Sequence, residues 1–88
     1  MRLTLLVRAY CHLCDEMAQA LLPLARAHDA TVDIVDVDAP EHAALEDAWG
    51  DRVPALFAGA PEKGLLLCTI RFDPAPVVAA LSTAPGSR

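Results

Sequence analysis

The spacing of apolar and polar residues divides the first part of the chain into a strand, a helix and a second strand. Residues 3–7 form an almost unbroken apolar run between two arginines, which is typical of a strand buried on both faces of a sheet. Between Leu13 and His28, positions recurring every three or four residues predict the buried face of a helix. Residues 31–38 are rich in β-branched side chains and predict a strand that is less deeply buried. The three elements form a βαβ unit, whose strands we expect to be parallel.

A short helix is predicted next. Asp38 and Glu41 have the spacing of a capping box, and Pro40 suits the first turn of a helix. We therefore interpret Asp38 as the residue that caps this helix. The apolar face of the helix is expected to consist of Leu45, Ala48 and Trp49. This spacing makes Trp49 a packing residue rather than a binding platform.

The last third of the chain predicts a hairpin and a helix. Residues 55–58 and 65–70 are apolar runs separated by a segment rich in turn-forming residues, as in an antiparallel hairpin. Asp73 and Pro74 predict the start of a final helix, whose buried side should consist of Val77, Val78 and Leu81. The predicted order is β-α-β-α-β-β-α, an α/β fold in which helices flank a four-stranded mixed sheet.

The length of the chain limits it to one domain. Its 88 residues are too few for two hydrophobic cores. We expect a single domain over residues 1–83 and a flexible tail over residues 84–88, where small and polar residues follow the last apolar position. We expect the protein to be a monomer.

Charge and hydropathy exclude several classes of partner. The net charge is -5, whereas a nucleic-acid-binding protein typically has an excess of basic residues that contact the phosphates. The uncharged stretches are much shorter than the roughly 20 apolar residues that a membrane-spanning helix needs. Only five residues separate Arg2 from Arg8, too few for the apolar region of a secretory signal. We therefore expect a cytoplasmic protein that binds neither nucleic acid nor membranes.

Candidate chemistry is concentrated in Cys11 and Cys14, which form a C-x-x-C pair where the first helix begins. Unpaired N–H groups at a helix N-terminus stabilise an anion, so the pKa of Cys11, the more exposed cysteine, should fall below the free value of ~8.5. This pattern indicates a redox dithiol. The alternatives are an incidental pair, or half of a zinc site whose other ligands come from elsewhere in the chain.

With these motifs the sequence resembles small glutaredoxin-like and thioredoxin-like proteins over residues 2–83. The resemblance rests on the strand, Cys-His-Leu-Cys, helix order and on the Val53-Pro54 pair about 40 residues later. It implies a thioredoxin-like fold and a dithiol-disulfide oxidoreductase, with Cys11 as the nucleophile and Cys14 as the resolving cysteine. It also implies that Pro54 is cis beside the dithiol, and that Val53 and Pro54 bind the substrate backbone.

Two residues that precede the dithiol each resemble a different family, one the thioredoxins and the other the glutaredoxins. Tyr10 occupies the position of a thioredoxin tryptophan, whereas Arg8 matches a basic residue that glutaredoxins use near the glutathione carboxylate. Both are therefore candidate substrate-binding residues. His12 and Leu13 depart from both families. A protonated His12 would stabilise the Cys11 thiolate further, or the side chain has no role.

The resemblance weakens where glutaredoxins carry a Gly-Gly pair, because this chain has Arg71 and Phe72 there. We therefore expect glutathione to bind weakly. Asp73 is better explained as a helix cap than as a ligand of the glutathione amino group. Cys68 lies within an apolar run and is expected to be a small packing residue, with a third redox cysteine as the alternative.

The function predicted from the sequence is thiol-disulfide electron transport with a protein or small-molecule disulfide as substrate. The cycle needs glutathione or a flavin-dependent reductase as electron donor, but no bound cofactor and no metal. Two alternatives use the same fold: a metal- or cluster-binding module, and a catalytically idle interaction domain.

Overall fold

The computed structural model describes residues 1–82, so residue 83 and the expected tail over residues 84–88 lie outside the described part of the chain. The elements are β1 (Arg2–Val7), α1 (His12–Ala27), β2 (Thr31–Asp36), α2 (Ala43–Trp49), β3 (Ala55–Ala58), β4 (Leu65–Thr69) and α3 (Pro74–Ser82). Two short 3-10 turns, η1 (Pro40–His42) and η2 (Gly50–Arg52), flank α2. The predicted order of helices and strands is confirmed.

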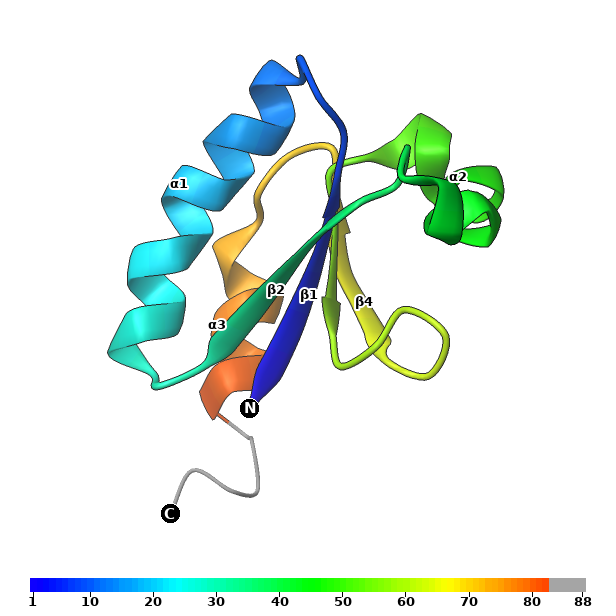
Figure 1. Cartoon of the computed structure of the whole chain (residues 1–88). Coiled ribbons are helices and arrows are strands. Elements are labelled where there is room, and N and C mark those ends of the chain that lie inside the picture. The colour runs from blue at the N-terminus through cyan, green and yellow to red at the C-terminus, as the bar shows by residue number, and fades with distance from the viewer. Residues whose placement is uncertain (83–88) are drawn as a thin grey trace.

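The four strands form one mixed sheet in the order β2-β1-β3-β4. β1 pairs in parallel with β2 and antiparallel with β3, so that Leu5 lies between Ile34 and Leu56. β3 and β4 form the predicted antiparallel hairpin, whose register shifts between Leu56 and Phe57. Figure 1 shows α1 and α3 on one face of the sheet and α2 on the other. The fold is therefore the expected α/β arrangement of a mixed sheet flanked by helices.

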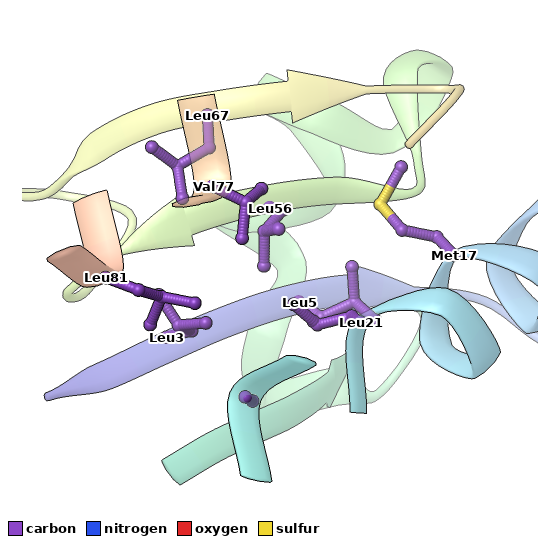
Figure 2. Close-up of a cluster of buried hydrophobic side chains, with 9 residues drawn as sticks. Leu3, Leu5, Met17, Leu21, Leu56, Leu67, Val77 and Leu81 are labelled. Atoms are coloured by element: carbon purple, nitrogen blue, oxygen red, sulfur yellow. The ribbon is translucent and has the colours of Figure 1, made fainter. Parts of the chain in front are cut away.

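The face covered by α1 and α3 holds the larger core. Because β1 is central, its apolar run is buried on both faces, as its sequence predicts. Helix α1 contributes a buried stripe at three- and four-residue spacing. Figure 2 shows these side chains meeting between the sheet and the two helices: Leu3, Leu5, Met17, Leu21, Leu56, Leu67, Val77 and Leu81.

The opposite face has a smaller core under α2. It consists of Leu6, Val37, Ala55 and Phe57. The ring of Trp49 packs edge-on against Phe57, with a centroid distance of 5.0 Å. Trp49 is therefore a packing residue, as predicted. No residue of α2 is fully buried, so this helix rests on the sheet through partly covered side chains.

Three sequence predictions about helix residues are wrong. Ala48 is exposed and does not join Leu45 and Trp49 against the smaller core. Asp38 does not cap the short helix, because η1 starts after Ala39 without a side-chain cap and α2 itself starts only at Ala43. Val78 is 39% exposed, because Val77 and Leu81, four residues apart, are the side chains that α3 turns toward the sheet.

Across residues 1–82, no helix combines the length and the apolar character needed to cross a bilayer.

Candidate active site

Cys11 occupies the N-cap position of α1. The chain leaves β1, and Tyr10 adopts a left-handed conformation with φ of 58°, which is uncommon for a residue other than glycine. Cys11 is then extended, and its Sγ accepts a hydrogen bond from the backbone N–H of Cys14 at 3.1 Å. The sulfur thus takes the place of the oxygen that usually caps a helix, where the helix dipole favours negative charge.

The two cysteines form a disulfide, so the structure represents the oxidised state of the site. Their Cα atoms are 5.2 Å apart, within the usual range for a disulfide. Cys14 is 3% exposed and lies on the buried stripe of α1, whereas Cys11 is partly exposed. The prediction that Cys11 is the more exposed of the two cysteines is confirmed.

The Val53-Pro54 peptide is cis, as the resemblance implies, and because Ala55 pairs with Leu6, it lies at the end of the sheet where β1 leads toward the dithiol. Pro54 is buried and leads directly into β3, next to the end of β1. Its carbonyl accepts a hydrogen bond from the N–H of Ile70 at 2.8 Å. That bond fixes the loop before α3 against the proline. Binding of a substrate backbone by Val53 and Pro54 stays a prediction.

The guanidinium of Arg8 points to the α2 side of the sheet. It makes two hydrogen bonds to Asp38, at 2.8 and 3.2 Å, one to Glu46 at 3.3 Å and one to the carbonyl of Gly50 at 3.0 Å. The hydrogen bond from Arg8 holds the pKa of the Asp38 carboxyl below its usual value. These contacts use most of the five N–H donors of an arginine, so a glutathione carboxylate would compete with Asp38 and Glu46 for them.

The side chain of Tyr10 is fully exposed immediately before Cys11. An aromatic ring with no packing role in the core is free to contact a substrate. His12 is also exposed, and Leu13 is partly buried. Tyr10 and Arg8 remain predicted substrate-binding residues, with Tyr10 the one whose side chain has no competing contact among the described residues.

A hollow of about 340 Å³ lies between α1 and the loop that precedes α3, and Leu13, which precedes Cys14, is among its lining residues. Its lining includes Leu13 and Met17 from the helix and Arg71 and Phe72 from the loop. In this loop Ile70 has φ of 71°, an unusual conformation for a β-branched residue. The sequence pattern of this segment, with Arg71 and Phe72 in place of a Gly-Gly pair and Asp73 as a helix cap, did not predict the hollow. The apolar Phe72 before a helix cap was the available signal.

Asp73 and Cys68, two residues near that loop, have structural roles. Asp73 accepts a hydrogen bond from the N–H of Ala75 at 3.2 Å, so its predicted capping role is confirmed. Cys68 lies opposite Leu56 on β4 and packs against the larger core. Burial raises the pKa of the Cys68 thiol. A hydrogen bond from the backbone of Asp73 lowers this pKa in part, and the negative charge of the Asp73 carboxylate raises it further. Cys68 is therefore a poorer nucleophile than an ordinary cysteine.

Within residues 1–82, no three side chains of His, Cys, Asp or Glu come together as a group that could hold a metal ion. The described part of the chain thus offers Cys11 and Cys14 no further ligands of these types.

Comparison with known proteins identifies the family. The model of the Glutaredoxin-like domain (DUF836) matches residues 2–82. No curated protein matches the sequence significantly.

Solved structures agree with this assignment. An NMR structure of a Nitrosomonas europaea protein is 32% identical, with a TM-score of 0.70 over 89% of this chain and 87% of that one. An X-ray structure of an X. campestris protein is 42% identical, with a TM-score of 0.62 over 94% and 99% of the two chains. Thioredoxin 1 from Thermosipho africanus is 18% identical, with a TM-score of 0.67 over 93% and 91%, and shows the fold alone. The chain therefore belongs to the glutaredoxin-like domain family and has a thioredoxin-like fold with a vicinal Cys11–Cys14 pair.

Proposed function

We propose that the protein is a glutaredoxin-like thiol-disulfide oxidoreductase with Cys11 as the nucleophile and Cys14 as the resolving cysteine. The observation that carries the proposal is the position of the Cys11 sulfur. It caps α1 at a partly exposed site, while Cys14 is buried one turn into the same helix. The helix N-terminus favours the thiolate of Cys11 in the reduced protein, and burial keeps Cys14 from solution disulfides.

The proposed cycle transfers two electrons in two exchange steps. The Cys11 thiolate attacks one sulfur of a substrate disulfide, forms a mixed disulfide with it and releases the other sulfur as a thiolate. Cys14 then loses its proton to solvent and attacks the Cys11 sulfur. The Cys11–Cys14 disulfide forms and the second substrate sulfur leaves as a thiolate, so that the substrate is reduced and the dithiol is oxidised. An external thiol or a flavin-dependent reductase returns two electrons to the pair.

The surroundings of the dithiol support a protein or peptide disulfide as the substrate. The exposed Tyr10 precedes Cys11 in the chain, and Leu13 and Phe72 add apolar groups to the lining of the hollow near the start of α1. Glutathione is a weaker candidate because Arg8 is already bound to Asp38, Glu46 and Gly50. We therefore propose a cytoplasmic enzyme that acts mainly on protein disulfides and takes electrons from a reductase more readily than from glutathione.

Reduction of insulin by wild type and single cysteine variants tests the proposal. We expect Cys11→Ser to abolish turnover, because no nucleophile remains at the helix cap. Cys14→Ser should instead accumulate a mixed disulfide between Cys11 and the substrate, detectable by mass spectrometry. Cys68→Ala is the matched control and should turn over like wild type.

Alkylation of the reduced protein supplies an independent measurement. Iodoacetamide at mildly acidic pH should label Cys11 before Cys14 and Cys68, because a thiolate reacts and a thiol does not. Equal labelling of Cys11 and Cys14, or full turnover by Cys11→Ser, would contradict the proposal. Stoichiometric zinc or an iron-sulfur chromophore in the purified protein, lost together with the fold on chelation, would favour the metal-binding alternative.

A further inference from the structure

A second hollow, of about 330 Å³, lies on the α2 face, between α2 and the loop that joins β3 to β4. Its apolar lining comes from Leu45 and Trp49 on the helix and Pro61 on the loop. Ala44 and Ala48 also face it, and their small side chains leave the space open. Figure 1 shows the helix and the loop on the same side of the sheet. The volume is at the lower end of the roughly 300–1,000 Å³ that ligand sites occupy.

The charged side chains that line this groove, Glu41 and Glu62, are both acidic. Glu41 lies on the η1 wall and Glu62 on the loop wall, and His42 adds a hydrogen-bonding side chain. Among residues 1–82, neither carboxylate has an ion-pair partner, and the lining of the groove includes no lysine or arginine. Two unpaired carboxylates on opposite sides of an apolar floor complement a cation that carries apolar groups.

One cation of the chain lies close by without neutralising these carboxylates. The guanidinium of Arg52 is 4.1 Å from the centroid of the Trp49 ring and donates a hydrogen bond to the carbonyl of Ala48 at 2.8 Å. Arg52 therefore occupies a face of the indole, and the cation of a ligand would bind to Glu41 and Glu62 instead. The net charge of -5 adds a long-range attraction for a basic partner.

We propose that this groove docks a segment of a partner protein in which a lysine is flanked by aliphatic side chains. The lysine ammonium pairs with Glu41 and Glu62, and the aliphatic groups cover Leu45 and Pro61. The site is independent of the proposed redox function, because none of its lining residues belongs to the dithiol or to the Val53-Pro54 loop. A contact this small binds weakly, as transient interfaces do.

Titration with a short peptide tests the site directly. The probe is acetyl-Leu-Lys-Leu-amide, and the matched control is acetyl-Leu-Glu-Leu-amide. Backbone amide NMR of 15N-labelled protein should show saturable shifts confined to residues 41–49 and to Glu62 with the probe, and none with the control. The fluorescence of Trp49, the only tryptophan of the chain, should follow the same saturation curve.

Variants separate the charge contribution from the apolar one. Glu41→Gln and Glu62→Gln should each weaken binding about two- to fivefold, the range of an exposed ion pair. Asp29→Asn removes the same charge at an exposed position at the end of α1 and should change the dissociation constant much less than either glutamate variant. Ala48→Leu keeps the helix propensity and fills the groove, so it should weaken binding at unchanged charge. Circular dichroism verifies the fold of each variant.

Three results would overturn the proposal. The first is equal weakening by Asp29→Asn and the two glutamate variants, since the attraction would then come from net charge alone. The second is equal binding of the control peptide. The third is saturable binding of hexylamine at these residues without binding of the peptide, which would assign the groove to small amines instead of a protein segment.

Discussion

The two faces of the sheet are held to their helices by different kinds of contact. On the α1/α3 face, nine buried residues form one core. Four residues of α1 are buried. On the α2 face the buried cluster has four residues, and α2 has no fully buried side chain. The polar contacts of Arg8 with Asp38, Glu46 and Gly50 connect the α2 segment to the end of β1.

This difference matches the division of chemistry in the molecule. Cys14 belongs to the same buried stripe of α1 as Met17 and Leu21, so the dithiol is attached to the most extensively packed part of the fold. A reacting group needs a fixed position relative to its partner, and rigid packing supplies it. The groove proposed as a docking site lies instead on the lightly packed face, where small adjustments cost less.

Truncation of one leucine on each face should sharpen the contrast most. Leu21→Ala removes a fully buried side chain from the larger core and should lower the free energy of unfolding by about 2–5 kcal/mol. Leu45→Ala removes a partly exposed side chain of α2 and should cost about 1 kcal/mol. Urea denaturation followed by circular dichroism measures both. Equal losses would show that the two faces are packed alike.

A smaller effect is expected for the cysteine on the outer strand of the larger core. Cys68→Ala shortens a half-buried side chain on β4 and should lower the free energy of unfolding on the order of 1 kcal/mol or less. Insulin reduction should continue at the wild-type rate, because the thiol takes no part in the proposed cycle. A correctly folded variant that has lost turnover would place Cys68 in the redox pathway after all.

The smallest effect should be the pH dependence of the polar contact on the α2 face. The folded pKa of Asp38 lies below its unfolded value of ~3.9, so its contribution is fully present above that value and is lost as the pH falls through the folded pKa. The difference in stability between wild type and Asp38→Asn should therefore be constant near neutral pH and vanish in strong acid. Denaturation curves over this range measure it. A difference that persists in strong acid would mean that the Asp38 charge does not stabilise the fold.

The sequence predicts the larger core and the dithiol well, because both depend on local patterns. The spacing that places Cys14, Met17 and Leu21 on one side of α1 is visible without any knowledge of the partner strands. The C-x-x-C pair and the start of its helix coincide, so the position of the Cys11 sulfur follows from the sequence. The crossover rule also predicts that β1 and β2 are parallel, whereas the position of β3 beside β1 does not follow from it.

The α2 face is less predictable from the sequence, because contacts with residues distant in the chain compete there with local contacts. Asp38 has the spacing of a helix cap, but its carboxylate binds Arg8, 30 residues earlier in the chain. A charged bidentate pair outweighs a single capping bond, and the sequence does not reveal that the two side chains meet. The left-handed conformations of Tyr10 and Ile70 are also not predictable, because such conformations are expected at glycine and neither position is a glycine.

The Cys11 sulfur is both the N-cap acceptor of α1 and the nucleophile of the proposed cycle. The Cys11 sulfur accepts the N–H of Cys14, and in the proposed cycle the same sulfur becomes bonded to substrate. A sulfur in a mixed disulfide is uncharged and a weaker acceptor than a thiolate, so the first turn of α1 is held less firmly at that stage than in the reduced protein. The fraying of that turn would therefore act as a reporter of redox state, readable as the amide exchange rate of Cys14. Serine at position 11 would preserve the hydrogen-bond acceptor while removing the chemistry, and alanine would remove both.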